Sequence, residues 1–318
     1  MMRESSFLEI IQEKTINAIE KVAHDLTQTV EGCYLPYIYF HDLWNLPVKP
    51  FHSAVNEFSK NIAFREKEDG EFELKMKIDE DGVGSPELRT TKAFLEKPFR
   101  EGNPTLIFHH GAGQCGYRKK LSFTFCGGPE LADCNLISVE AQAHDSRKSF
   151  QERAFDSLMH QQATFAGSVL MEEELVKWCK SHESPAVIVG SSMGGIVAAW
   201  HWLIFNTGDL YFPVAAYPNV TEIFLGPRYA CAVDRIDERR KMPAYRQAFQ
   251  AEPRALKDNI HKVFPILGEK DRIVDYNTAR NWWNGFNILH FPYGHAVSWA
   301  KRKEIADYIA EKMRESGV

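Results

Sequence analysis

A serine between two glycines is the strongest chemical signal in the sequence. The pattern Gly190-x-Ser192-x-Gly194 follows an apolar run at 186–189 and precedes a stretch that predicts a helix. A serine on so tight a strand-to-helix turn needs flanking glycines, because a Cβ there would collide with the neighbouring strand and helix. The helix N-terminus would also stabilise an oxyanion with its partial positive charge. The pattern predicts Ser192 as a nucleophile, and Ser191, off the centre of the turn, as a packing residue.

A serine hydroxyl is a weak nucleophile unless a base takes its proton and an acid orients that base. Asp271 follows an apolar run at 263–267, so we expect it in a loop at the carboxyl end of a strand, where α/β sheets gather their reactive groups. Glu269 and Asp275 are the rival acids. Glu269 lies closer to the strand, and Asp275 has the position of a charge that begins the next helix. Position in the loop and order along the chain favour Asp271.

The base is predicted to be His295. This residue lies between the last predicted strand, at 287–291, and the last predicted helix, at 297–315. The rival, His290, falls inside or at the end of that strand, where we expect it to point into packing. A histidine base predicts activity that rises as the pH passes about 6.5, the ordinary histidine pKa.

A glycine-rich loop follows the apolar run at 105–108, and it is the expected source of backbone N–H groups for an oxyanion. The N–H of Ala112 is the best candidate donor, with Gly111 or Gly113 as near neighbours. The N–H of Met193, directly after the predicted nucleophile, is the second donor. A loop that cradles phosphate would need a G-x-G-x-x-G or a Walker lysine, and neither is present.

The elements that must position these residues alternate along the chain. Continuous apolar runs separated by helical stretches are typical of a parallel sheet covered on both faces. The apolar runs lie at 105–108, 136–139, 186–189, 214–217, 263–267 and 287–289, and the predicted helices at 150–180, 194–206, 276–284 and 297–315. Before residue 104 the pattern of residues is different. Charged and apolar residues alternate along 71–79, between two Asp-Gly pairs, which indicates antiparallel strands.

Two further segments are set apart within what we take as a single domain, 1–318. Ser6 and Glu9 have the spacing of a capping box, which predicts an N-terminal helix within 1–30. This helix either packs on the main domain or forms a homodimer. The stretch 219–258 is too long for a plain connection and is rich in charges and aromatics. We expect it to be a helical, cap-like insertion over the sheet edge that carries the site.

Composition narrows the class of protein. The chain has 318 residues, with 44% hydrophobic and 25% charged residues, which suffices for a large core. A net charge of -5 argues against nucleic-acid binding. The sequence contains no apolar run of about 18 residues and no apolar signal segment, so we expect no stable membrane insertion. The six cysteines form no C-x-x-C pair, which favours a reduced, cytoplasmic setting over disulfides or zinc.

Taken together, His110-Gly111, the pattern around Ser192, Asp271 and His295 resemble the α/β-hydrolase superfamily, and in particular its esterase-like and lipase-like members, over about residues 100 to 315. The resemblance implies an α/β fold with a mostly parallel eight-stranded sheet, helices on both faces and a cap inserted after the sixth strand. It also implies a Ser-Asp-His triad. The segment 140–146 departs from the Asp-x-x-Gly-x-Gly-x-Ser loop common in that superfamily.

These residues predict hydrolysis of a carboxylic ester, or a thioester, through an acyl-enzyme, with no metal and no organic cofactor. The expected partner is a small-molecule acyl substrate, and we assign His110 and Tyr217 to substrate binding. A serine peptidase acting on short peptides needs the same groups and stays an alternative. A binding protein of the same fold without catalytic activity is the alternative from another class.

Overall fold

The central strands are mostly apolar because packed side chains cover both faces of the sheet. Along β6 (Ala186–Ser191), Val187 and Val189 pack into one core, and Ile188 packs into the other. The neighbouring strands β4 (Thr105–His109) and β7 (Leu210–Val214) are buried at every position. This alternation divides the interior into two hydrophobic cores, one on each side of the sheet.

The computed structural model describes residues 49–78, 87–115, 126, 128–154, 158–226, 236–251 and 259–318. The helix predicted within 1–30 lies outside these residues. The described helices are α2 (Phe51–Phe58), α3 (Arg147–Arg153), α4 (Leu158–Ser181), α5 (Met193–Ile204), α6 (Val220–Leu225), α7 (Ile236–Lys241), α8 (Pro243–Gln247), α9 (Tyr276–Trp282), α10 (Val297–Ala300) and α11 (Arg302–Glu315), with 3-10 turns η1 (Ser59–Asn61) and η4 (Pro129–Leu131).

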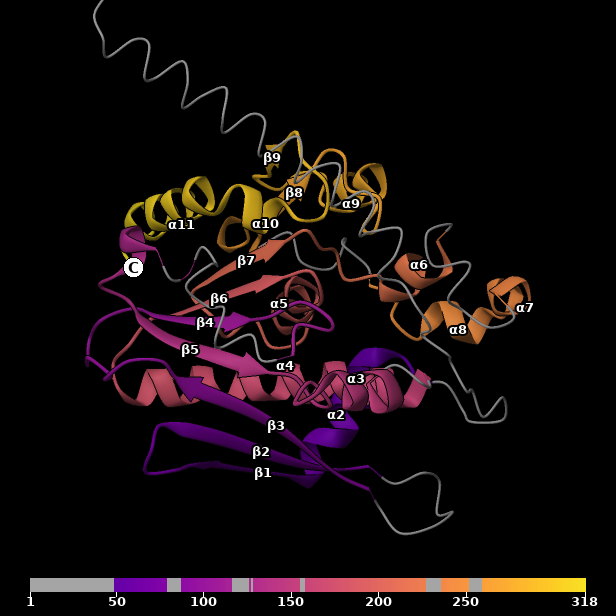
Figure 1. Cartoon of the computed structure of the whole chain (residues 1–318), viewed down its shortest axis with the longest axis horizontal. Helices are drawn as coiled ribbons and strands as arrows, with labels where there is room; N and C mark the ends of the chain where they lie inside the picture. Colours follow the sequence, from indigo (N-terminus) through magenta and orange to yellow (C-terminus); the bar gives the residue numbers. More distant parts are fainter. Residues whose placement is uncertain are drawn as a thin grey trace, which may run out of the picture.

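The described strands form one mixed sheet in the order β1-β2-β3-β5-β4-β6-β7-β8-β9 (Figure 1). The remaining strands are β1 (Ile62–Glu66), β2 (Glu71–Ile78), β3 (Glu87–Leu95), β5 (Asn135–Glu140), β8 (Ile266–Gly268) and β9 (Leu289–Phe291). The six strands from β4 to β9 pair in parallel. The three strands β1 to β3 pair antiparallel with one another, and β3 pairs antiparallel with β5.

The predicted α/β class and mostly parallel sheet are confirmed, with two differences in detail. The described sheet has nine strands instead of eight, because the short, charged β1 adds an antiparallel edge strand that no apolar run marks. The strand predicted at 214–217 is wrong in position, since β7 is Leu210–Val214. The sequence does not indicate a strand at 210–214 because it contains Pro213, and proline is rare inside a sheet. The strand ends at Val214, and the next residue, Ala215, has φ 50°.

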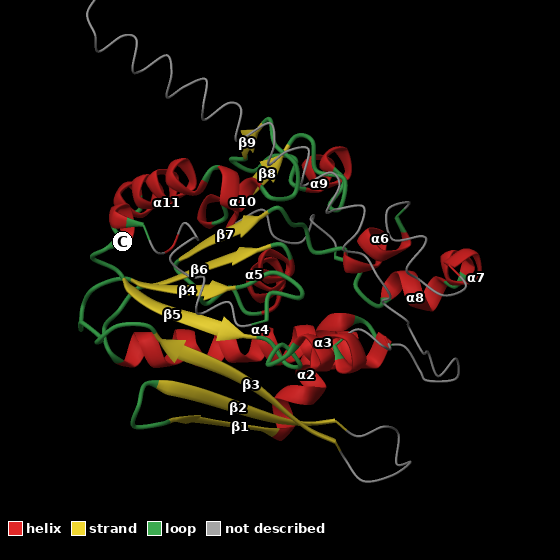
Figure 2. Cartoon of the chain, viewed as in Figure 1, coloured by secondary structure: helices red, strands yellow, loops and turns green. Residues whose placement is uncertain are grey.

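Helices cover both faces of the sheet (Figure 2). Residues of α2, α4, α5 and α9 contribute to one core, and residues of α10 and α11 contribute to the other. Two of the long predicted helices are each two helices: 150–180 overlaps α3 and α4, and 297–315 contains α10 and α11.

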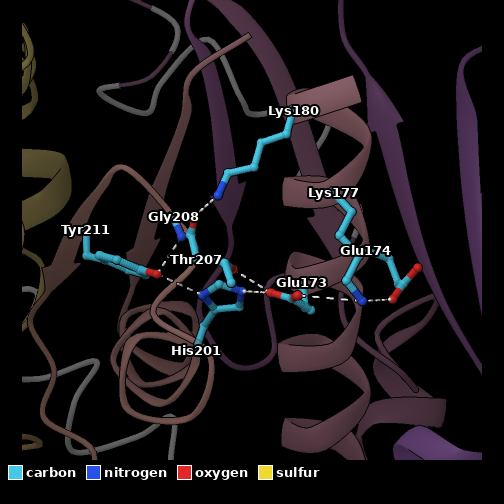
Figure 3. A network of polar contacts seen from close by, with 8 residues as sticks. All are labelled: Glu173, Glu174, Lys177, Lys180, His201, Thr207, Gly208 and Tyr211. Carbon is cyan, nitrogen blue, oxygen red and sulfur yellow. Dashed lines mark hydrogen bonds and ion pairs between the residues drawn. The ribbon is translucent and has the colours of Figure 1, made fainter. Parts of the chain in front are cut away.

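A buried polar network joins α4 to α5 and to the start of β7 (Figure 3). Glu173 on α4 lies 3.2 Å from Nε2 of His201 on α5, and Nδ1 of His201 lies 3.2 Å from the hydroxyl of Tyr211. That hydroxyl also accepts a hydrogen bond of 2.8 Å from the N–H of Gly208. The network fixes the C-terminal part of α5, the opposite end of the helix from Ser192.

The insertion after β7 is helical where the structure describes it. It contains α6, α7 and α8, and Figure 1 shows these helices on the side toward which the arrowheads of β6 and β7 point. The Arg240 guanidinium donates two hydrogen bonds, of 3.0 and 2.9 Å, to the carbonyl of Leu225 and so ties α7 to α6. The N–H of Ala251 donates to Oδ1 of Asn219 at 2.8 Å, which ties the described segment 236–251 to the start of the insertion. Its role as a cap stays a prediction.

The first turn of α5 packs so closely against the end of β4 that it leaves no room for a side chain at Gly194. A Cβ on Gly194 would lie 2.1 Å from the carbonyl oxygen of His109, which is a backbone atom and cannot move aside. Gly194→Ala should therefore lower the free energy of unfolding by about 3 kcal/mol, at the upper end for overpacking. Urea denaturation measures this loss.

Gly102→Ala is the matched control, because Gly102 has φ +75° but open space around its Cβ. It should lose only about 1 kcal/mol, the cost of a left-handed alanine. Equal losses at the two positions would show that the close approach at Gly194 is not what constrains the packing of α5 against β4.

Candidate active site

Ser192 lies at the turn between β6 and α5, with φ 55° and ψ -115°. Its N–H donates to the carbonyl of Val214 at 2.8 Å, so the turn is fastened to the end of β7. A Cβ on Gly190 would lie 2.1 Å from the carbonyl carbon of Gly194. The flanking glycines are therefore required by contact distance, as the sequence pattern predicts, and the turn presents the serine side chain at the carboxyl edge of the sheet.

Ser192, His295 and Asp271 lie in one hydrogen-bonded chain. The Ser192 hydroxyl lies 2.8 Å from Nε2 of His295, and Nδ1 of His295 lies 2.8 Å from Oδ2 of Asp271. An ionised carboxylate only accepts hydrogen bonds, so Nδ1 carries the proton and Nε2 is left to accept from the serine. The arrangement can move the serine proton to the imidazole.

Asp271 is held rigidly from its other side. Its Oδ1 accepts hydrogen bonds from the N–H groups of Ile273 and Val274, at 2.9 and 3.0 Å. Its side chain is 2% exposed, whereas the side chain of His295 is 16% exposed. The carboxylate therefore has one oxygen bound to backbone and one oxygen directed at the imidazole.

The loops that carry Asp271 and His295 meet over Gly268, the last residue of β8. A Cβ on Gly268 would lie 2.6 Å from the carbonyl oxygens of Tyr293 and Gly294. The N–H of Lys270 donates to the carbonyl of Tyr293 at 2.9 Å, which holds the two loops together. Parallel pairing of β8 with β9 thus brings the two residues to one edge of the sheet.

The rival residues occupy other positions. Glu269 is exposed, and Asp275 caps α9, where its Oδ1 accepts from the N–H of Thr278 at 2.9 Å. His290 is exposed on β9, 3.2 Å from the hydroxyl of Tyr276, so the expectation that it points into packing is wrong.

Ser191, the rival nucleophile, is a packing residue as predicted. Its side chain is buried, and its hydroxyl donates to the hydroxyl of Ser298 at 3.0 Å.

The loop after β4 lies directly against Ser192. A Cβ on Gly111 would be 3.4 Å from the Cβ of Ser192, so the backbone of this loop passes within van der Waals contact of the serine turn. The N–H of Gly111 donates to Oε1 of Gln114 at 3.2 Å, and the N–H of Gly113 donates to Nε2 of His144 at 3.2 Å. Between them, the N–H of exposed Ala112 has no acceptor among the described residues.

Met193 offers a second backbone N–H at the same turn. It is the first residue of α5, and the first N–H groups of a helix have no acceptor within that helix. The arrangement can therefore direct two backbone donors toward an oxygen bound beside Ser192.

The two residues assigned to substrate binding are buried, and their role in binding stays a prediction. His110 is fully buried, its Nδ1 lies 2.7 Å from the carbonyl of Gly111, and its Nε2 accepts from the N–H of Ala141 at 3.1 Å. Tyr217 is 2% exposed, and burial is the main cause that raises the pKa of its phenol.

His144 is the functional candidate that sequence reasoning missed. It is fully buried in the loop after β5, next to the loop after β4. A histidine just beyond the carboxyl end of a predicted central strand was the available signal. Burial is the main cause that lowers the pKa of His144 to about 4. Burial, together with a neighbouring imidazole, lowers the pKa of His109 and the pKa of His110 to about 3. All three are neutral at pH 7.

The described residues hold no group of three or more His, Cys, Asp or Glu side chains that could bind a metal ion. No helix within the described ranges has both the length and the apolar character needed to cross a membrane.

Among solved structures, acetyl xylan esterase 1 from Thermoanaerobacterium sp. JW/SL YS485 is similar, with a TM-score of 0.53. The match covers 84% of this chain and 92% of that chain at 13% identity. This chain has the α/β-hydrolase fold. At such low identity the likeness shows the fold alone.

Two further structures are more distantly similar. The acetyl xylan esterase from Paenibacillus sp. R4 has a TM-score of 0.49 at 13% identity, over 89% of this chain and 98% of that chain. Est1E from Butyrivibrio proteoclasticus has a TM-score of 0.46 at 16% identity, over 76% and 98%. No protein-family model matches the chain, and no curated protein matches it significantly.

The buried histidines predict how the stability of this α/β-hydrolase fold depends on pH. Their pKa values are lower in the fold than the unfolded value of about 6.5, so between pH 6.5 and about 4 the unfolded chain binds protons that the fold excludes. The free energy of unfolding should fall as the pH drops below 6.5, by about 2 kcal/mol per histidine at pH 5. Above pH 6.5 these residues should contribute no pH dependence.

Urea denaturation of the wild type and of His144→Gln at pH 7 and pH 5 measures this effect. The loss between the two pH values should be smaller by about 2 kcal/mol in the variant, whatever its stability at pH 7. Identical losses would contradict the assignment of a neutral, buried His144.

Proposed function

We propose that this chain is a serine hydrolase that cleaves a carboxylic ester through an acyl-enzyme intermediate. The observation that carries the proposal is the hydrogen-bonded chain from the Ser192 hydroxyl through His295 to Asp271, with both contacts at 2.8 Å. The left-handed backbone of Ser192 at φ 55° supports it, because such strain persists where the surrounding structure imposes it.

In the first half of the reaction, the Ser192 oxygen attacks the acyl carbonyl carbon while Nε2 of His295 takes the hydroxyl proton. The carbonyl π electrons move to oxygen, which the N–H groups of Met193 and Ala112 stabilise. Asp271 holds the imidazole in the required tautomer and stabilises the imidazolium. The tetrahedral intermediate then collapses: the bond to the alcohol breaks, and His295 returns its proton to the leaving oxygen.

In the second half, a water molecule attacks the acyl carbon of the ester formed on Ser192. His295 takes a proton from this water, and the same two N–H groups stabilise the second tetrahedral intermediate. Its collapse breaks the bond to the Ser192 oxygen, which recovers its proton from His295. The acid is released, the enzyme returns to its initial state, and one water is consumed for each ester.

The similar solved structure described above is named an acetyl xylan esterase, which supports the ester class. A thioester presents the same carbonyl to the same groups. An assay of p-nitrophenyl esters from acetate to palmitate, beside acyl thioesters and aminoacyl anilides, defines the acyl length and the leaving group. Anilide hydrolysis in excess of ester hydrolysis would show that the ester assignment is wrong.

Covalent labelling tests the nucleophile directly. A fluorophosphonate probe should label the wild type at Ser192, and Ser192→Ala should abolish both labelling and ester hydrolysis, because the Ser192 hydroxyl is the oxygen that lies 2.8 Å from Nε2 of His295, the proposed base. Ser191→Ala is the matched control and should still label, since its hydroxyl contacts Ser298 instead. Mass spectrometry of the labelled peptide identifies the residue. An unlabelled wild type, or equal labelling of Ser192→Ala, rules out the hydrolase.

Replacement of the orienting acid tests the tautomer. In Asp271→Asn the amide oxygen should stay on the N–H groups of Ile273 and Val274, so the amide NH₂ faces Nδ1 of His295. Nδ1 must then accept, Nε2 carries the proton, and the serine loses its base. The expected loss in kcat is about 10⁴-fold, the magnitude known for the serine protease triad.

Glu269→Gln, at the exposed neighbouring carboxylate, is the control for Asp271→Asn and should change kcat less than about threefold. Equal losses in the two variants would mean that Asp271 does not orient the base.

A further inference from the structure

Two loops beside Ser192 are joined reciprocally by buried histidines. His110, from the loop after β4, accepts from the N–H of Ala141 at 3.1 Å. His144, from the loop after β5, accepts from the N–H of Gly113 at 3.2 Å. In each case Nδ1 faces a carbonyl of its own loop, at 2.7 Å for His110 and 2.9 Å for His144. Both rings are therefore neutral, with Nδ1 as donor and Nε2 as acceptor.

Four rings follow one another in a continuous row of tilted contacts, which we call the histidine ladder: His109, His110, His144 and Phe150. Their centroids are 5.1, 4.9 and 4.8 Å apart in that order. The three histidines have no exposed surface, and Phe150 extends the ladder onto α3. Packing on both sides leaves the ring of His144 no freedom to turn away from Gly113.

The backbone is bent to bring His144 to this position. Ala143, directly before it, has φ 58°, a left-handed conformation that alanine adopts only at a cost of about 1 kcal/mol or more. Gly113, which donates to His144, has φ +70°, and a Cβ there would lie 3.3 Å from the ring of Phe150. Gly113 and Ala143, the residue before His144, thus both have positive φ, as expected where a loop is held in one conformation.

Fixing Gly113 fixes the peptide next to it. The N–H of Gly111 is anchored on Gln114, and the N–H of Gly113 is anchored on His144. Ala112 lies between these two anchors, which restrict the direction of its N–H. Donors that stabilise an oxyanion are effective because they are oriented before the charge forms.

We propose that His144 is a positioning residue for the reaction, which orients the Ala112 N–H by anchoring Gly113. The proposal rests on the proposed hydrolase function. His144 touches no reacting atom and acts through the loop. Removing its acceptor should leave substrate binding intact and slow the chemical step, because the donor matters most when the negative charge develops.

The test compares variants at one position. His144→Phe keeps the ring in the ladder and removes the acceptor, whereas His144→Gln keeps an acceptor at the reach of Nε2. His144→Asn is polar like glutamine but too short to reach Gly113, and it carries the same expectation as His144→Phe if that variant does not fold. His261→Phe, on the exposed segment before β8, is the matched control. For each protein the measurements are kcat, KM, labelling of Ser192 and amide hydrogen exchange of the peptide covering 109–115.

In His144→Phe and His144→Asn we expect kcat to fall by about 10- to 100-fold, less than the loss from removing a donor outright, with KM within about threefold. The amide of Gly113, which loses its acceptor, should exchange faster. His144→Gln should retain kcat within about fivefold and exchange slowly, and His261→Phe should match the wild type. A merely structural role would not separate asparagine from glutamine in this way.

The two proposals fail in different ways. Suppose that the wild type labels at Ser192 and hydrolyses ester. If His144→Phe then has the same kcat and the same amide exchange as the wild type, the role of His144 is overturned and the proposed hydrolase function is retained. Equal losses in His144→Gln and His144→Asn would also overturn it. A wild type that neither labels at Ser192 nor hydrolyses any ester would overturn the proposed function itself, and the exchange measurement would then decide whether His144 anchors Gly113.

Discussion

The site depends on one close approach, the contact of Gly194 with the carbonyl of His109. A Cβ at Gly194 would lie 2.1 Å from that oxygen, so the first turn of α5 can reach the end of β4 only without a side chain. This contact brings the serine turn, at the end of β6, beside the loop that follows β4. Gly111 then lies against Ser192, beside the backbone of the serine turn. Pairing of β4 with β6 sets the two segments side by side, and the close approach of α5 fixes how near they come.

Strain is concentrated at the same edge of the sheet. Ala143, Ser192 and Ala215 follow β5, β6 and β7, and all three have φ between 50° and 58° although none is glycine. Each such residue costs of order 1–3 kcal/mol, so each must be held by its surroundings. Ser192 donates to Val214, and Ala215 donates to Ile266, each at 2.8 Å, which links the three successive strand ends β6, β7 and β8. The stability of the whole sheet thus maintains local conformations that an isolated loop would not keep.

Much of this arrangement is visible in the sequence, and the exceptions have physical reasons. Asp271 and His295 could be chosen because each follows an apolar strand, and parallel strands gather their carboxyl ends at one edge. β7 was misplaced because Pro213 sits within it, and β1 was missed because an edge strand carries no continuous apolar run. The roles of His110 and His144 depend on which way each ring packs across two loops. Such a long-range contact leaves no periodic signal in the chain.

Environment, and not residue type, separates the roles of the histidines. His109, His110 and His144 are fully buried, and desolvation holds them neutral, so they serve as fixed donors and acceptors that cannot carry a proton through a reaction. His295 is different in both respects: its side chain is partly exposed, and its Nδ1 faces the carboxylate of Asp271, which stabilises the imidazolium form. A base must accept and return a proton, whereas a positioning residue must do neither. The ladder is therefore suited to hold the loop still while, in the proposed reaction, His295 changes its charge.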